Sequence, residues 1–116
     1  MRKILYSPGY GAGWSTWNSQ YDKKLVCEYV PIIEALEREE NLLGENGRYG
    51  EFDVSKAHPA IQQFDKELRE RYGQDIHFYY GGLEDLAIHE VGDNVQVRID
   101  EYDGNESVVT GHSDYF

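Results

Sequence analysis

Hydrophobic and polar positions follow two different periods along the chain, and the change of period separates helices from strands. Apolar side chains recur every three or four positions over residues 25–36 and 61–72, which predicts two amphipathic helices. Five shorter segments have the apolar runs or the two-residue alternation of strands: 3–7, 76–80, 86–91, 95–99 and 107–110. The predicted order of elements is therefore β-α-α-β-β-β-β.

Residues typical of helix ends fall at the boundaries of both helical patterns. Asp22 is the expected N-cap of the first helix, and His58 lies at the expected cap of the second, which Pro59 opens and Gly73 ends. Pro31 lies inside the first pattern, where it removes one backbone hydrogen bond. Either the helix kinks at Pro31, or Pro31 opens a separate helix.

The clustering of strands after the helices predicts an α+β fold for one domain spanning residues 1–116. We expect a mostly antiparallel sheet of about five strands with two helices packed on one face. Asp103 and Gly104 form a hairpin signal between the last two strands. A two-layer domain of this size buries roughly 65% of its unfolded surface, so we also expect it to form a homo-oligomer.

Composition and charge exclude several classes of partner. The 22 acidic and 11 basic residues give a formal net charge of −11, which opposes broad contact with nucleic acid or an anionic membrane. No apolar run approaches the ~20 residues needed to span a bilayer, and no secretory signal pattern opens the chain. The single cysteine excludes an intrachain disulfide framework. We therefore expect a cytoplasmic protein.

The segment from Pro8 to Asn18 is uncharged and combines glycine with aromatic residues. Glycines at alternate positions favour an irregular backbone whose N–H groups can hold an anion, and aromatic rings can stack on a planar ligand. The spacing matches neither a Walker loop nor a dinucleotide fingerprint. In the alternative interpretation, Trp14 and Trp17 simply fill the core. The predicted ligand-binding residues are Tyr6, Gly9, Tyr10, Gly11, Gly13, Trp14, Trp17 and Arg98.

Basic side chains are scarce, so each one bears on the choice of ligand. Arg98 projects from the polar face of a predicted strand, where it either binds a phosphate or forms a cross-strand salt bridge with a nearby carboxylate. The other cations able to make a pocket locally positive are Arg2, Lys3 and Arg48.

No catalytic or metal-binding constellation stands out. His77 and His89 fall on adjacent predicted strands, but Glu90 points to the opposite face from His89, and His112 lies in the tail. Cys27 lacks a neighbouring base and is expected to be a small buried side chain. Residues 100–106 lack the register of a calcium loop and are expected to form a solvated hairpin tip. These patterns favour a protein without enzymatic activity, metal or cofactor.

The acidic surface has two interpretations. A surplus of carboxylates keeps a protein soluble, and carboxylates spread over a compact surface can also occupy a basic groove built for nucleic acid. The second interpretation predicts an inhibitor that blocks a basic host protein.

Two segments carry a resemblance to known proteins. Residues Ile4–Trp17, with the sequence ILYSPGYGAGWSTW, and residues Glu101–Val108 resemble a widespread family of small phage proteins, most of them uncharacterised. The architecture and the glycine-aromatic loop are also similar to Thoeris anti-defence proteins. This second resemblance implies an oligomeric sponge in the host cytoplasm that sequesters a cyclic nucleotide-like immune signal without cleaving it. The predicted function is sequestration of a small nucleotide-like ligand, and the alternative is the acidic inhibitor.

Overall fold

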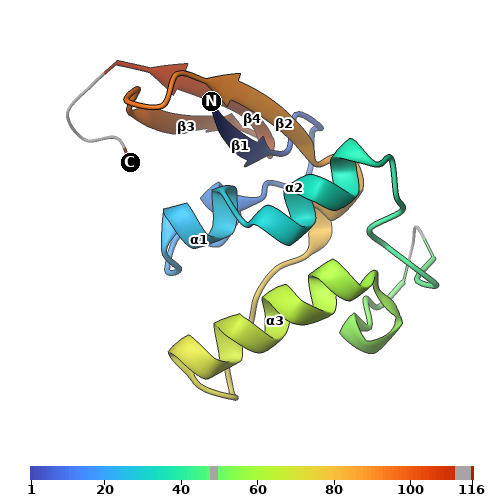
Figure 1. The fold of residues 1–116 in the computed structure, drawn as a ribbon. Coiled ribbons are helices and arrows are strands. Elements are labelled where there is room, and N and C mark those ends of the chain that lie inside the picture. The colour runs from blue at the N-terminus through green and yellow to red at the C-terminus, as the bar shows by residue number, and fades with distance from the viewer. Residues whose placement is uncertain (48–49, 112–115) are drawn as a thin grey trace.

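The computed structural model describes residues 1–47, 50–111 and 116, and it confirms the α+β class (Figure 1). The strands are β1 (Arg2–Tyr6), β2 (Ala87–Val91), β3 (Val97–Tyr102) and β4 (Asn105–Thr110). The α-helices are α1 (Lys23–Cys27), α2 (Val30–Glu37) and α3 (Pro59–Tyr72). Short 3-10 turns cover Ser15–Trp17, Val54–Lys56 and Gly81–Asp85.

The prediction of one five-stranded sheet is wrong. The described residues form two separate two-stranded antiparallel sheets, one from β1 and β2 and one from β3 and β4. Ile4 lies opposite His89 in the first sheet, and Ile99 lies opposite Val108 in the second. Asp103 and Gly104 both have positive φ (49° and 84°), as the predicted two-residue hairpin requires.

Segment 76–80 is the predicted strand that does not form. Its alternation is real, because Phe78 and Tyr80 are buried whereas His77 and Tyr79 are exposed. Its backbone, however, finds side-chain partners instead of a neighbouring strand: the Tyr21 hydroxyl donates to the His77 carbonyl (2.9 Å). A two-residue period identifies the buried face of an extended segment but does not specify what its backbone bonds to.

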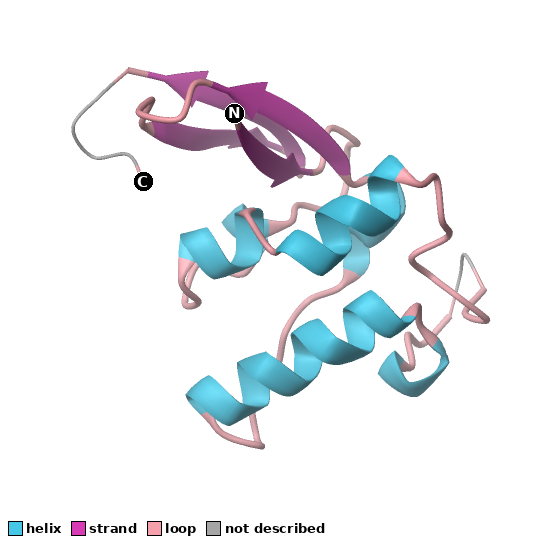
Figure 2. Cartoon of the chain, in the orientation of Figure 1, coloured by secondary structure: helices cyan, strands magenta, loops and turns pink. Residues whose placement is uncertain are grey.

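The helices are stacked in layers and do not share one face of a sheet (Figures 1 and 2). Helix α1 contacts β1, and α2 contacts both β2 and α3. Helix α3 therefore covers α2, not a sheet, which corrects the expectation of two helices on one sheet face. Among the described residues, no helix is long and apolar enough to cross a membrane.

Pro31 separates two helices, which settles the two alternatives. Helix α1 ends at Cys27, and Pro31 lies in the first turn of α2. Backbone N–H groups in the first turn make no hydrogen bond within the helix, so proline costs no bond at this position. The predicted cap is confirmed, because the carboxylate of Asp22 accepts a hydrogen bond from the backbone nitrogen of Leu25 (3.0 Å).

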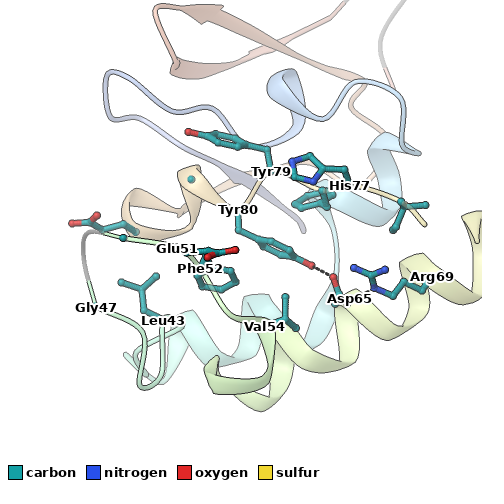
Figure 3. Close-up of a pocket in the computed structure, with 15 residues that line it drawn as sticks. Leu43, Gly47, Glu51, Phe52, Val54, Asp65, Arg69, His77, Tyr79 and Tyr80 are labelled. Atoms are coloured by element: carbon teal, nitrogen blue, oxygen red, sulfur yellow. Dashed lines mark hydrogen bonds and ion pairs between the residues drawn. The ribbon is translucent and has the colours of Figure 1, made fainter. Parts of the chain in front are cut away.

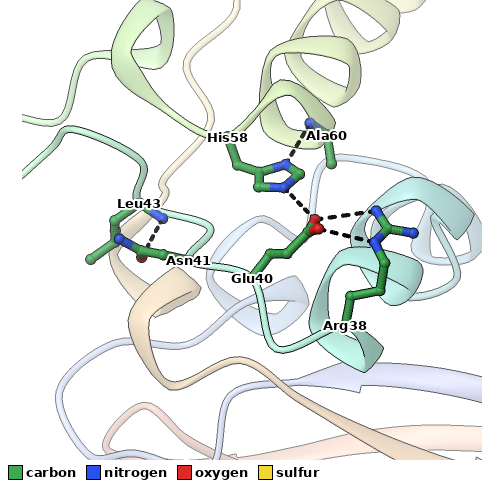
Figure 4. A network of polar contacts seen from close by, with 6 residues as sticks. All are labelled: Arg38, Glu40, Asn41, Leu43, His58 and Ala60. Carbon is green, nitrogen blue, oxygen red and sulfur yellow. Dashed lines mark hydrogen bonds and ion pairs between the residues drawn. The ribbon is translucent and has the colours of Figure 1, made fainter.

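The start of α3 is fixed by a polar network that reaches the segment after α2 (Figure 4). Nδ1 of His58 accepts from the backbone nitrogen of Ala60 (3.0 Å), which confirms the cap, and Nε2 lies 2.8 Å from Glu40 Oε1. Glu40 also accepts from Arg38 Nε (3.1 Å). These hydrogen bonds, first from Arg38 and then from His58, lower the pKa of the Glu40 carboxyl.

The core is aromatic and lies between α3 and the sheet layer. Ring centroids lie 5.1 Å apart for Trp14 and Phe78, 5.2 Å for Phe64 and Phe78, and 4.7 Å for Phe78 and Tyr80. A smaller apolar cluster around Ile4 packs between the two sheets. Such close aromatic packing adds stability beyond the area buried and gives the surrounding loops a rigid base.

Candidate functional site

The glycine-aromatic loop is organised around a buried carboxylate, that of Glu106 in β4. Its Oε1 accepts from the backbone nitrogen of Ser7 (2.9 Å), and its Oε2 accepts from the backbone nitrogens of Trp14 (2.8 Å) and Thr16 (3.0 Å) and from Thr16 Oγ1 (2.5 Å). Glu106 is 1% exposed, so the prediction of a solvated hairpin tip is wrong for this residue. The anion held by this loop is therefore the protein's own side chain.

The same loop rests on the turn of the β3–β4 hairpin. The backbone nitrogen of Gly11 donates to the Asp103 carbonyl (2.6 Å), and a side chain at Gly104 would overlap the backbone of residues 11–12. Tyr10 stays 70% exposed on this side. Tyr6 is half-buried with its ring edge-on to His89, whose centroid lies 6.2 Å away. Of the predicted ligand-binding tyrosines, only Tyr10 offers most of its ring to solvent.

The two tryptophans have different roles. Trp14 is fully buried in the core, and its indole nitrogen donates to the carbonyl of Val26 (2.8 Å). It presents no face to a ligand. Trp17 is 38% exposed and packs on Tyr79, with ring centroids 5.3 Å apart. The spacing of the two residues left open whether they form core or site; the structure buries Trp14 in the core and leaves Trp17 partly exposed.

The predicted cations of the site are engaged with carboxylates. Arg98 Nε donates to Asp100 Oδ1 (2.6 Å), a pair within one strand and not across two. Arg2 pairs with Glu28 (2.9 Å), and Lys3 pairs with Glu37. Arg48 lies outside the described residues, as does His112. These described cations are therefore already paired with carboxylates, and two backbone nitrogens of the loop, those of Trp14 and Thr16, donate to Glu106.

A separate cavity of about 530 Å³ opens between residues 43–47 and 50–54, segment 76–81 and α3 (Figure 3). Its wall includes the stacked rings of Phe52 and Tyr80, whose centroids lie 5.0 Å apart at an interplanar angle of 30°. Tyr79 and His77 also border it, and Trp17 packs on Tyr79 without lining the cavity itself. None of the ligand-binding residues predicted from the sequence lines this cavity.

The polar end of the cavity is built on α3. Asp65 is 8% exposed; its Oδ1 accepts from the Tyr80 hydroxyl (2.7 Å), and its Oδ2 accepts from Arg69 Nε (2.8 Å). Arg69 also donates through Nη1 to the Gln74 carbonyl. Burial, together with the hydrogen bond to Asp65, raises the pKa of Tyr80, so its hydroxyl remains protonated. A carboxylate and a guanidinium thus lie side by side next to an aromatic wall.

The loop and the cavity are joined through Asn18 and two glycines. The Asn18 amide donates to the carbonyls of Trp14 (2.7 Å) and Tyr79 (2.9 Å) and accepts from the Tyr79 nitrogen (2.7 Å). A Cβ at Gly81 would overlap the Tyr79 ring, and a Cβ at Gly13 would lie 2.8 Å from Trp17 Cδ1. These glycines leave room for the Tyr79 ring, which lines the cavity, and for the Trp17 ring packed on it.

Other predicted chemistry has no assembled counterpart. His77 and His89 do not lie on adjacent strands, because residue 77 is outside any strand. Among the described residues, no group of three or more His, Cys, Asp or Glu side chains is placed to hold a metal ion. Burial raises the pKa of the Cys27 thiol to about 12, so this residue stays a neutral thiol in the core.

Comparison of the chain with family models, with curated proteins and with solved structures finds no match.

Proposed function

We propose that the protein is a non-catalytic binding protein that sequesters a small nucleotide-like ligand in the cavity between residues 43–47 and 50–54, segment 76–81 and α3. The observation that carries this proposal is a 530 Å³ hollow with stacked aromatic rings on one wall and the Asp65–Arg69 pair at one end. Small-molecule sites are typically concave hollows of roughly 300–1,000 Å³ with apolar walls and a few polar groups that set orientation.

The proposal moves the expected site from the glycine-aromatic loop to the cavity beside it. Glu106 accepts from the backbone nitrogens of Trp14 and Thr16 in the loop, and the Trp14 side chain fills the core. Trp17 keeps a place at the rim because it packs on Tyr79. Stacking on rings such as that of Tyr79 is the main interaction available to a planar base.

Binding without catalysis agrees with the groups around the cavity. The Tyr80 hydroxyl remains protonated and donates to Asp65, and Asp65 is also held by Arg69. These groups are suited to orienting a ligand, whereas an activated nucleophile needs a base positioned to remove its proton.

Isothermal titration calorimetry against a panel of nucleosides and nucleotides tests the proposal. We expect binding by the unmodified protein and at least a tenfold weaker affinity in Tyr79→Ala, because stacking on one ring contributes about 1–3 kcal/mol. Tyr102→Ala is the matched control, since Tyr102 is 78% exposed on β3 and does not line the cavity. Equal weakening by both substitutions, or no binding of any panel member, contradicts the proposal.

We further propose that the protein is a phage product that acts as a homo-oligomer in the host cytoplasm and counters a host defence by withdrawing its signal. Native mass spectrometry of protein purified from infected cells measures the number of subunits and the mass of a retained ligand together. A monomer without a retained ligand contradicts both the proposed homo-oligomer and the proposed withdrawal of a signal.

The alternative of a nucleic-acid mimic receives less support. On and around α2, three carboxylates pair with the chain's own basic side chains, in the pairs Arg2–Glu28, Lys3–Glu37 and Arg38–Glu40. Pairing lowers the negative potential that a mimic must present to a basic groove. Binding to a basic partner that weakens steeply with salt would favour the mimic.

A further inference from the structure

We infer that the cavity recognises an uncharged purine ring of the guanine type through its hydrogen-bonding edge, and not a phosphate group. The inference rests on the proposed function, because it names the ligand class for the same cavity. Three features carry it: the charge of the lining, the aromatic stack and the pair of polar groups at one end.

The charge of the lining opposes a phosphate. The described residues that border the cavity include the carboxylates of Glu51 and Asp65 and the guanidinium of Arg69. The carboxylate of Glu84 also borders the cavity, but it has a partner of its own and is not counted in this balance. Arg69 already donates to Asp65. A phosphate would bring further negative charge beside these carboxylates, whereas a neutral ring would not.

The aromatic wall favours a flat ring. Phe52 and Tyr80 are stacked, and Tyr79 borders the same space from the rim, as Figure 3 shows. A heterocycle entering this space can stack on rings already held by the core and by Gly81, so little side-chain order has to be created on binding.

The polar end has the complement of a guanine edge. An ionised carboxylate has about four acceptor positions, and the bonds from Tyr80 and Arg69 use one on each oxygen of Asp65. The remaining positions can accept the ring N–H and the exocyclic amino group of guanine. The guanidinium of Arg69 can donate to the guanine carbonyl oxygen beside them.

An adenine ring fits this end less well. Its edge presents one amino donor next to an unprotonated ring nitrogen, so an oxygen of Asp65 would face a lone pair. Leaving a polar group in a ligand site unpaired weakens binding more than a missing apolar contact does. The arrangement therefore selects for two adjacent N–H donors.

Titration calorimetry of the unmodified protein with four ligands tests this selection. We expect guanosine to bind at least tenfold more tightly than adenosine, inosine to bind about tenfold more weakly than guanosine because it lacks the amino donor, and guanosine monophosphate to bind no more tightly than guanosine. Adenosine binding as tightly as guanosine, or a phosphate that strengthens binding tenfold, overturns the inference and leaves the proposed function standing. Failure of all four to bind overturns the inference, and the wider panel of nucleosides and nucleotides then decides the proposed function.

Asp65→Asn supplies a second test on the protein side. The amide has one acceptor oxygen, so guanosine should bind at least tenfold more weakly while adenosine affinity changes less than threefold. Asp75→Asn, at an exposed position beyond α3, is the control. Circular dichroism establishes that Asp65→Asn is folded, and if it is not, the comparison of guanosine with inosine decides the question without any substitution. Equal losses for guanosine and adenosine in folded Asp65→Asn overturn the inference.

Discussion

The side-chain amide of Asn18 bonds to both backbone polar groups of Tyr79. Its Nδ2 donates to the Tyr79 carbonyl (2.9 Å), and its Oδ1 accepts from the Tyr79 nitrogen (2.7 Å). An antiparallel strand would make the same two bonds with its backbone. Here one side chain from the glycine-aromatic loop makes them, and this contact fixes the rim of the cavity relative to the loop.

Asn18→Ala should destabilise the protein by about 2–4 kcal/mol, because it leaves buried backbone groups of Tyr79 and Trp14 without partners. The measurement is the free energy of unfolding from urea denaturation monitored by tryptophan fluorescence. Asn94→Ala, at an exposed position between β2 and β3, should change stability by less than about 0.5 kcal/mol. Similar values for the two variants would show that the amide is not holding Tyr79.

Glu106→Gln should also be strongly destabilising, by roughly 2–3 kcal/mol, although the two side chains have nearly the same size and shape. The amide group of glutamine would point donors at donors, because every partner of the Glu106 carboxylate is an N–H or O–H group. Glu90→Gln on β2 is exposed and serves as the comparison in the same urea titration. If Glu106→Gln is as stable as Glu90→Gln, the hydrogen bonds accepted by both oxygens of Glu106 do not stabilise the loop.

Gly81→Ala should weaken ligand binding about tenfold or more, because the new methyl group would displace the Tyr79 ring from the cavity rim. Gly92→Ala, in the turn after β2, introduces the same methyl group away from the cavity and should leave affinity unchanged. Calorimetric affinities of the two variants decide between a local effect and a general one. Full affinity in Gly81→Ala would mean that the Tyr79 position is not needed.

The two tryptophans should respond differently to alanine. Trp14→Ala removes a fully buried ring and should destabilise by about 3–5 kcal/mol, whereas Trp17→Ala, at a partly exposed position, should cost about 1 kcal/mol. Thermal unfolding followed by circular dichroism measures both. Trp17→Ala is therefore the informative variant for ligand binding, since the protein stays folded. Equal melting temperatures would contradict the division of the pair into core and rim.

The contact between Glu40, Arg38 and His58 predicts a specific dependence on pH. Hydrogen bonds from Arg38 and His58 lower the pKa of the Glu40 carboxyl in the folded state, so its stabilising contribution is present above its ordinary pKa of 4.5 and is lost as pH falls through the lower folded value. The stability difference between the unmodified protein and Glu40→Gln should shrink as the pH is lowered from about 6 to about 2. Urea titrations across this range measure it, with Glu45→Gln as the exposed control. A stability difference that grows as the pH falls would mean that the folded state does not lower the pKa of the Glu40 carboxyl, and it would contradict this prediction.

Local patterns predicted most of the elements and little of their assembly. The apolar periods located α3 and all four strands to within a few residues, because those signals depend on neighbours along the chain. The pairing of strands into two sheets depends on contacts between distant residues, and no local period reports it. Segment 76–80 shows the limit: its backbone partners include Asn18 and Tyr21, more than 50 residues earlier.

Two positions in the sequence pattern indicate the buried carboxylates of the cavity and the loop. Asp65 follows Phe64 within the apolar face of α3, and a carboxylate on a buried helix face indicates a partner beneath it. Glu106 and Val108 are two positions apart on β4, so their side chains point to the same face of the strand. Because Val108 packs inward, this spacing indicates that the carboxylate of Glu106 also faces inward. Neither signal identifies the partner, because Tyr80 and the loop backbone are brought in from other parts of the chain.

The carboxylate of Glu106 also sets an order of events during protein synthesis. Its bonds to Ser7, Trp14 and Thr16 join residues 99, 92 and 90 positions apart. The glycine-aromatic loop is synthesised before β4 and receives its central acceptor only when β4 has left the ribosome. Closing so long a stretch of chain is slow compared with forming a helix. The hydrogen bonds between the loop and Glu106 therefore form only after the long stretch of chain that separates them has been translated.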